Sequence, residues 1–278
     1  MNGFNRIVFV ALGVAVSTLG AHALESAGQK PAAQKPEAAH EKHWGYEDGK
    51  ESVGPEKWGT LPGDGTCAAG KRQAPINVRA GVATPRDLPN LVFAYKPSHL
   101  SIANNGHTEQ VTYDTGSSLS LVGGKDTWTL AQFHFHAPSE HQVDGTSYPL
   151  EMHLVHVDAA GKPAVVVGVF IRAGQENAAL ARAFQNLPAK AGEKVDRPSE
   201  IIEAGAVLPA DKTFFTYTGS LTTPPCTEDI TWYVLKTPIE MSKAQIAAFT
   251  TLEHLGHTNR PIQGLAGRVV LVDSTPAK

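Results

Sequence analysis

The stretch "QFHFHAPSEH" (132–141) places histidines where they could bind a metal ion. Successive side chains of a β-strand point to opposite faces of the sheet. His134 and His136 would therefore share one face, while Phe133 and Phe135 share the other. Two imidazoles on one face of a strand can converge on one ion. The pair alone does not establish a site, because buried histidines satisfied by hydrogen bonds are common.

A second segment, "LEMHLVHV" (150–157), adds a third imidazole. Its Glu151, His153 and Val155 share one face, and the turn sequence "DGTSYP" before it predicts a hairpin that brings His153 beside the first pair. Three imidazoles leave the fourth tetrahedral position open, as in catalytic zinc sites. Gln132 and Glu151 each lie two residues from a ligand on the same face. They are candidates to accept the second ring N–H of a ligand.

The same residues permit a competing metal site. "HFHAPSE" fits the first half-motif of the cupins, H-x-H-x3-E, in which Glu140 would itself be a metal ligand. The second cupin half-motif requires P-x-G before its histidine. The residues before His153 are "YPLEM", so that half of the pattern is missing.

Strands dominate the segments that must position these side chains. Alternating or β-branched runs bounded by Gly, Asn, Asp and Ser predict strands at 91–95, 100–105, 109–114, 119–122, 127–137, 150–158, 164–174, 229–235 and 268–273. Helical periodicity occurs at 177–187 and 242–252, and Ser242 is placed to cap the second helix. We predict a mostly β domain with one large, mainly antiparallel twisted sheet and a few peripheral helices.

Composition and the N-terminal segment limit the classes of function. The chain has 278 residues, a formal net charge of −3 and no run dense in Lys or Arg, which argues against a nucleic-acid partner. Residues 1–23 have the n-region, apolar h-region and small-residue cleavage site of a secretory signal peptide, with cleavage near Ala23. Residues 24–40 are rich in Ala, Lys, Gln and Pro and predict a disordered linker. The folded domain is expected at 41–278, in the periplasm or outside the cell, with no membrane contact after cleavage.

Export changes the interpretation of the two cysteines. Cys67 and Cys226 are the only cysteines of the chain, and an oxidising compartment permits a disulfide between them. Two free buried thiols are the alternative. Neither cysteine belongs to a C-x-x-C motif, which argues against redox catalysis.

Several motifs together resemble one family. The strands that carry the histidines, the segment "GSLTTPPCTEDITW", the N-terminal "HWGY", and the pieces "NNGH" and "NRPIQ" are similar to those of the alpha-class carbonic anhydrases of the exported bacterial type. The resemblance runs from about residue 43 to 273. One departure is that only "APS" separates His136 from Glu140, which is shorter than in animal members.

The resemblance implies a zinc enzyme that hydrates carbon dioxide reversibly to bicarbonate and a proton. The three histidines would bind Zn²⁺, and zinc-bound hydroxide would attack the substrate. Thr222 would accept a hydrogen bond from the hydroxide and donate one to ionised Glu140. In this arrangement Glu140 orients the threonine and is not a metal ligand. Thr223 is expected to help hold bicarbonate.

The resemblance also implies a substrate pocket and a proton path. The apolar wall beside the metal is expected from Val155, Val166, Leu221 and Trp232. His107 corresponds to the proton shuttle, and Tyr46 and Asn105 to positions that order the water chain. The peptides Ala74–Pro75 and Pro224–Pro225 are expected to be cis. His43, His141, His156, His254 and His257 receive no role.

One further alternative concerns the class of function. The family includes members that lost zinc ligands and serve as non-catalytic binding modules. The complete set of three histidines, together with Thr222, Glu140 and His107, favours the enzyme. The partner would be a small molecule, carbon dioxide or bicarbonate. The sequence leaves an oligomer open.

Overall fold

The computed structural model describes residues 42–273. The expected signal peptide (1–23) and linker (24–40) lie outside these residues. About 40% of the residues are in strands and 12% in helices. The prediction of a mostly β domain is therefore confirmed. Within residues 42–273, no helix is both long and apolar enough to cross a membrane.

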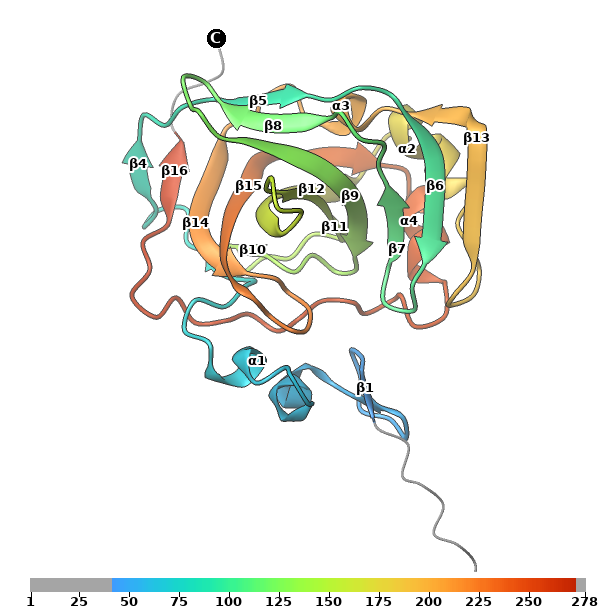
Figure 1. The fold of residues 1–278 in the computed structure, drawn as a ribbon, viewed down its shortest axis with the longest axis horizontal. Coiled ribbons are helices and arrows are strands. Elements are labelled where there is room, and N and C mark those ends of the chain that lie inside the picture. The colour runs from blue at the N-terminus through green and yellow to red at the C-terminus, as the bar shows by residue number, and fades with distance from the viewer. Residues whose placement is uncertain (1–41, 274–278) are drawn as a thin grey trace, which may run out of the picture. The chain divides into compact units, whose positions relative to one another are not determined.

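One twelve-stranded sheet forms the centre of the fold (Figure 1). Its strand order is β13-β6-β7-β9-β11-β12-β15-β14-β16-β4, with β8 pairing both β9 and β5 beside this path. Most neighbours are antiparallel, as predicted; β12 with β15 and β16 with β4 are parallel. Two small parallel pairs, β1 with β2 and β3 with β10, lie outside the large sheet.

Every predicted strand is present in the sheet, with its ends shifted by a few residues. These strands are β5 (Leu91–Ala94), β6 (Ser98–Asn104), β7 (Glu109–Thr112), β8 (Ser118–Leu121), β9 (Thr127–His136), β11 (Leu150–Val157), β12 (Pro163–Ala173), β15 (Glu228–Met241) and β16 (Leu271–Asp273).

Other strands were not predicted. They are β1 (His43–Trp44), β2 (Ser52–Val53), β3 (Asn77–Val78), β4 (Thr84–Arg86), β10 (Gln142–Val143), β13 (Lys194–Ile202) and β14 (Phe214–Ser220). The edge strand β13, "KVDRPSEII", is exposed along most of its length and contains a proline. It therefore lacks the apolar alternation by which a strand is recognised in sequence.

The helices are short and peripheral. They are the 3-10 helix η1 (Pro55–Thr60) and the α-helices α1 (Thr66–Ala69), α2 (Ala178–Phe184), α3 (Ala204–Val207) and α4 (Lys243–Thr250). The predicted cap of α4 is confirmed, because Ser242 and Gln245 form a reciprocal capping box. Figure 1 shows α2 and α4 on the side of the sheet where β6, β7 and β13 lie.

The two faces of β9 carry different chemistry, as the alternation of side chains predicts. Phe133 and Phe135 are fully buried and belong to the larger apolar core. The ring of Phe135 also meets Phe184 of α2 and Phe249 of α4. His134 and His136 point to the opposite face. The phenylalanines therefore anchor β9 from behind and fix the plane from which the histidines project.

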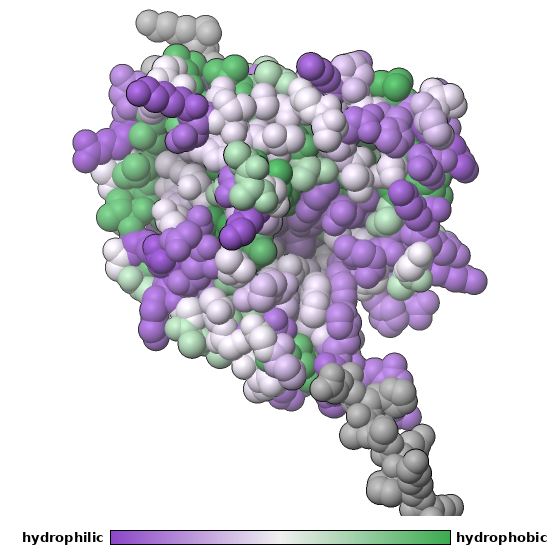
Figure 2. All heavy atoms as spheres, viewed as in Figure 1, coloured by the Kyte–Doolittle hydropathy of each residue, from purple (hydrophilic) through white to green (hydrophobic). Residues whose placement is uncertain are grey.

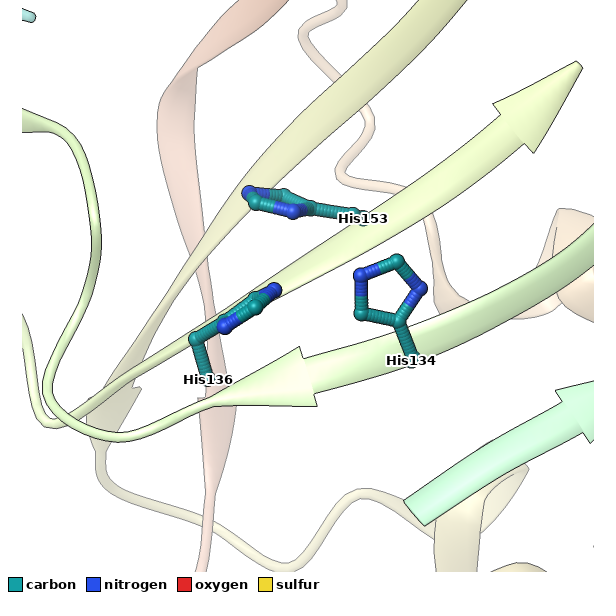
Figure 3. A group of neighbouring side chains, drawn as sticks. All are labelled: His134, His136 and His153. Carbon is teal, nitrogen blue, oxygen red and sulfur yellow. The ribbon is translucent and has the colours of Figure 1, made fainter. Parts of the chain in front are cut away.

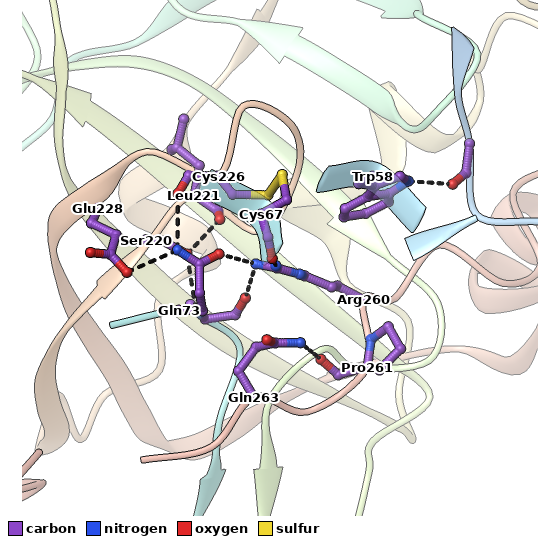
Figure 4. The surroundings of a disulfide bond; sticks show 12 residues. Trp58, Cys67, Gln73, Ser220, Leu221, Cys226, Glu228, Arg260, Pro261 and Gln263 are labelled. Atoms are coloured by element: carbon purple, nitrogen blue, oxygen red, sulfur yellow. Dashed lines mark hydrogen bonds between the residues drawn. A yellow bond between two sulfur atoms is a disulfide. The ribbon is translucent and has the colours of Figure 1, made fainter. Parts of the chain in front are cut away.

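A disulfide joins two segments that lie far apart in the chain. Cys67 and Cys226 are bonded across a separation of 159 residues (Figure 4). Arg260 is buried beside it and donates to Gln73 Oε1, the Ala74 carbonyl and the Cys67 carbonyl, while its guanidinium stacks over Trp58. The predicted cis peptides Ala74–Pro75 and Pro224–Pro225 are present, and Ala137–Pro138 is also cis.

Glu109 of β7 is a buried carboxyl without adequate partners. The residue is 0% exposed, and neither carboxyl oxygen has a hydrogen bond of standard geometry within the described residues. Burial raises the pKa of Glu109 to about 8, and the Asn104 amide lowers it only partly. The folded protein therefore keeps Glu109 protonated over a pH range in which the unfolded chain ionises it.

Replacing Glu109 should change how stability depends on pH. The folded-state pKa lies above the unfolded value, so the stability present in acid is lost as the pH rises toward about 8. Glu109→Gln cannot ionise, so its free energy of unfolding should exceed that of the unmodified protein by about 1–4 kcal/mol at pH 9, with a smaller difference at pH 5. Urea denaturation at both pH values measures this. Glu253→Gln, at a side chain 78% exposed, is the control; an equal response in the two variants would contradict the prediction.

Opening the disulfide should destabilise the fold. A bond that closes a 159-residue loop restricts the unfolded chain, which on the loop-entropy model is worth up to roughly 5 kcal/mol. Thermal unfolding with and without a thiol reductant should show a lower Tm in the reduced protein. The double variant Cys67→Ser/Cys226→Ser should melt at the reduced Tm and ignore the reductant. An unchanged Tm on confirmed reduction would show that the bond adds no stability.

Candidate metal centre

Three histidines from two adjacent strands converge on one point (Figure 3). The antiparallel register of β9 with β11 sets His153 directly across from His134, and His136 follows two residues further along β9. Each offers a ring nitrogen, and these three nitrogens lie within 4.8 Å of one another. His136 and His153 are 1% exposed, while His134 is half-buried.

The other ring nitrogen of each histidine already has a partner. His134 Nδ1 lies 2.8 Å from Gln132 Oε1, and His153 Nε2 lies 2.9 Å from Glu151 Oε1. His136 Nδ1 lies 2.6 Å from the Thr258 carbonyl oxygen. Because these partners only accept, each ring must donate there, and its remaining nitrogen carries a lone pair.

The lone pairs that remain have the character of metal ligands. His136 Nε2 is buried and has no hydrogen-bond partner in the part of the chain that the structure describes. Such a nitrogen is costly to bury unless something binds it. Burial is the main cause that lowers the pKa of His134 and His153 and brings that of His136 to about 4. All three rings are therefore neutral at pH 7, the form that binds a cation.

Glu151 connects the histidines to a second buried network. Besides His153, it accepts from the backbone N–H and Nδ1 of His141, and His141 Nε2 meets the Tyr217 hydroxyl at 2.6 Å. His141, Glu151 and His153 could also be grouped as metal ligands. Their facing atoms are already joined in hydrogen bonds, so we assign this group to positioning. A Cβ at Gly168 of β12 would approach Glu151 Oε1 to 2.9 Å, which explains a glycine there.

Glu140 is buried close to the histidines but does not accept a hydrogen bond from any of them. Its Oε1 accepts the backbone N–H of Arg260 at 2.8 Å, and Oε2 lies 3.6 Å from His136 Nε2. Burial raises the pKa of Glu140 to about 7, against the lowering influence of His153, the Arg260 N–H and the Thr222 hydroxyl. A cation held by the imidazoles would further favour the ionised form.

The threonine pair lies in the loop between β14 and β15. Thr222 is buried at 5% exposure, and Thr223 is half-buried. The Thr223 carbonyl accepts the N–H of Cys226, and the cis Pro224–Pro225 peptide lies between them. The disulfide therefore ties this loop to the segment at Cys67 (Figure 4).

The four expected apolar wall residues belong to one cluster. Val155, Val166 and Trp232 are buried in the smaller of the two sheet cores, and Leu221 packs against it. The Trp232 ring meets His153 edge-on with centroids 4.8 Å apart. Trp232 donates its indole N–H to the Ser220 carbonyl, which holds the ring beside the threonine loop.

A cavity of about 810 Å³ contains the residues expected along the proton path, His107, Tyr46 and Asn105. Asn105 Oδ1 accepts the N–H groups of His107 and Thr108 and so shapes the turn. The Tyr46 hydroxyl is buried without a hydrogen-bond partner among residues 42–273. Figure 2 shows a hollow in the face over β9 and β11, bordered largely by hydrophilic residues.

Several residues at the site were not found from sequence. The Thr258 carbonyl, the Arg260 N–H, His141 and Tyr217 make contacts across sequence separations of 76 to 122 residues. Nothing in the motif "NRPIQ" indicates that the backbone N–H of its arginine, Arg260, donates to Glu140. Backbone donors and acceptors carry no side-chain signature, so only the folded chain reveals them.

Comparisons with known proteins agree on one family. The family model described as eukaryotic-type carbonic anhydrase matches residues 53–274. A carbonic anhydrase of Neisseria gonorrhoeae is 42% identical over 231 residues, covering 82% of this chain and 87% of that protein. Human carbonic anhydrase 7 is 36% identical over 258 residues, covering 82% and 96%.

Solved structures give the same result. The alpha-carbonic anhydrase of Thermovibrio ammonificans, in complex with the inhibitor sulfanilamide, has a TM-score of 0.76 and 39% identity, covering 83% of this chain and 99% of that one. The alpha-carbonic anhydrase of Photobacterium profundum has a TM-score of 0.74 and 36% identity, covering 82% and 100%. With the converging histidines, these matches show that the chain belongs to the alpha-type carbonic anhydrases, a family of lyases.

Proposed function

We propose that the chain is a zinc-dependent carbonic anhydrase, which converts carbon dioxide and water to bicarbonate and a proton and catalyses the reverse. The observation that carries the proposal is the set of three neutral imidazoles. Each has one nitrogen held by an acceptor and the other turned toward a common point. This donor set matches zinc with an open position, which catalysis requires.

His134 and His136 would hold the metal through Nε2, and His153 through Nδ1, because their other nitrogens are engaged. Zinc, when bound, supplies a Lewis acid that lowers the pKa of water to about 7. Gln132, Glu151 and the Thr258 carbonyl keep the rings oriented and raise their basicity. Glu151 is itself held by His141, so the orientation of His153 depends on a network that is buried throughout.

Thr222 and Glu140 would orient the attacking oxygen. Ionised Glu140 can only accept, so in a hydrogen bond between the two the Thr222 hydroxyl would donate and keep its lone pairs for a donor in the pocket. An oxygen that donates to Thr222 has its own lone pair turned toward the substrate. The Arg260 N–H on the other carboxyl oxygen keeps Glu140 in place.

Carbon dioxide would lie against the apolar cluster beside the histidines. The substrate has no charge and gains from leaving water for a surface formed by Val155, Val166, Leu221 and Trp232. The product is an anion and needs a polar partner, a role we give to Thr223. Carbon dioxide would thus contact the apolar cluster, whereas bicarbonate would contact Thr223. This difference favours replacement of bound bicarbonate by a new molecule of carbon dioxide.

Each hydration leaves a proton that must reach solvent, and we propose His107 as its acceptor. The imidazole lines the cavity with Tyr46 and Asn105. In the observed orientation the His107 ring stacks on Trp44. Burial, and to a smaller extent the nearby His43, lowers the pKa of His107 to about 4. An acceptor with a pKa of about 4 is poorly matched to a proton that comes from zinc-bound water with a pKa of about 7.

Two alternatives remain weaker than this proposal. A non-catalytic binding module would not need the ligand set, the threonine and the carboxylate to be present together. In a cupin-type site Glu140 would bind the metal together with the histidines, whereas the group whose ligand atoms lie within 4.8 Å of one another consists of His134, His136 and His153 without Glu140. Export to the periplasm or outside is supported by the Cys67–Cys226 disulfide, since such bonds persist in oxidising compartments.

The purified chain should contain about one zinc per molecule and should hydrate carbon dioxide. Metal content by mass spectrometry and stopped-flow hydration with a pH indicator measure both. A chelator that removes zinc should reduce the rate to near the uncatalysed one, and added zinc should restore it.

His153→Ala should lose both zinc and activity, because two imidazoles hold the ion weakly. His99→Ala, at a partly exposed histidine outside the group, should retain both. Full activity in a metal-free preparation would overturn the proposal.

Thr222 should affect the rate without affecting zinc content. Thr222→Val keeps the shape and removes the hydroxyl, so kcat/KM should fall by about 10- to 100-fold, as for other groups that orient a ligand. Thr222→Ser should keep most of the activity. Because Glu140 acts through the same hydroxyl, adding Glu140→Gln to the Thr222→Val variant should lower kcat/KM little further. Independent losses in the double variant would contradict the coupling.

A further inference from the structure

Arg260 is a buried cation that forms no ion pair within residues 42–273. Its exposed fraction is 2%. Arg72 and Arg172, in contrast, lie at the surface and pair with carboxylates. A guanidinium keeps its proton at any ordinary pH, and a buried charge is costly unless a counter-charge and hydrogen bonds compensate it. Burial lowers the pKa of Arg260, and the carboxyl of Glu140 opposes this from beyond ion-pair distance.

The hydrogen bonds of this guanidinium use uncharged acceptors and leave two N–H groups unused. Nη1 donates to Gln73 Oε1 at 2.8 Å and to the Ala74 carbonyl at 2.9 Å, and Nη2 donates to the Cys67 carbonyl at 3.0 Å (Figure 4). Trp58 covers one face of the group. Nε and the second hydrogen of Nη2 have no acceptor in the described part of the chain. Two N–H groups of one guanidinium edge form a fork that fits two oxygens of one anion.

A small pocket adjoins the guanidinium. Its volume is about 160 Å³, and its walls include Pro55 and Glu56 of η1, Cys67 of α1, and Arg260 and Gln263 of the C-terminal segment. At about 30 Å³ for each water molecule, it has room for a small anion with a few waters and excludes a bulky one. The unused N–H groups and the space beside them therefore occur together.

The other charged side chain at the pocket is Glu56, which is exposed. An exposed carboxylate is surrounded by water and screened by salt, so it opposes an anion only weakly. The charge of Arg260 is buried, where the lower effective dielectric constant makes its attraction stronger. The attraction should therefore exceed the repulsion, and a change of Glu56 alone should shift the balance.

We propose that this pocket binds a small planar oxyanion, of the class to which formate and bicarbonate belong, through Nε and Nη2 of Arg260. The anion supplies the counter-charge that the described chain does not. No step of the proposed reaction uses this site, so it stands independently of that function, although bicarbonate would be the product. The backbone N–H of Arg260 donates to Glu140, which joins the pocket to the candidate metal site through one residue.

The test is thermal unfolding of the full chain in sodium formate and in sodium gluconate at equal ionic strength. Both anions are carboxylates, but gluconate is too bulky for the pocket. An anion that binds the folded chain alone raises its Tm, so about 200 mM formate should raise Tm by about 2–4 °C relative to gluconate. An equal Tm in the two salts would leave the pocket to water and overturn the proposal.

A variant at the rim locates the effect. Glu56→Gln removes the repulsive charge, so the formate concentration that gives a fixed rise in Tm should fall by about 2- to 5-fold. Glu253→Gln makes the same change at a carboxylate 78% exposed outside the pocket and should leave that concentration unchanged. Formate held at a metal would stabilise both variants equally. An equal response of the two variants would therefore overturn the proposal.

A second variant tests the fork itself. Arg260→Lys keeps the positive charge but loses the paired N–H groups, so about 10-fold more formate or higher should be needed for the same rise in Tm. An unchanged formate dependence in this variant would overturn the proposal. If Arg260→Lys does not fold, the comparison of Glu56→Gln with Glu253→Gln still decides. Hydration activity is measured separately, and its absence would overturn the proposed function without bearing on this site.

Discussion

The register between β9 and β11 sets His153 across from His134, and the three imidazoles meet only because of it. A slip of one residue would turn every side chain of β11 to the other face of the sheet. The register is held from the opposite side by Phe133 and Phe135, which are fully buried in the larger core. Apolar packing on one face thus fixes the polar geometry on the other.

Burial then gives the polar groups their chemical character. Removed from water, the histidines stay neutral, and each must find a partner for its N–H group. Gln132, Glu151 and the Thr258 carbonyl are those partners, and Glu151 is in turn satisfied by His141. The lone pairs that remain unpaired within the described residues, above all on His136, are the ones that a metal ion would use. Glu109 is also buried, but its carboxyl oxygens have no hydrogen-bond partner of standard geometry among residues 42–273, and burial raises its pKa to about 8, so the carboxyl group is protonated instead.

The rim of the cavity depends on a separate part of the chain. The N-terminal pair β1–β2 supplies Trp44 and His43, and Trp58 of η1 packs near them beside the disulfide. This segment contributes no strand to the large sheet, yet its Trp44 stacks on the ring of His107. The candidate metal site and the cavity that contains His107 therefore depend on two different substructures.

Local pattern in the sequence was sufficient to predict several features of the fold and the site. Alternation along 127–137 and 150–158 was enough to predict two strands, their buried faces and the convergence of the histidines, since side-chain period 2 is a property of any strand. The cap of α4 at Ser242 was equally local. The exposed strand β13 was missed because its contacts are made by backbone groups along a polar edge.

The groups that complete the site are brought there by long-range contacts of the folded chain. The Thr258 carbonyl, the Arg260 N–H, His141 and the stacking of His107 on Trp44 all join segments that lie far apart in the chain. Such contacts depend on where the whole sheet brings two segments, and backbone donors and acceptors are the same at every residue. The candidate ligands could therefore be named from sequence, whereas the groups that orient them and the surroundings of His107 required the fold.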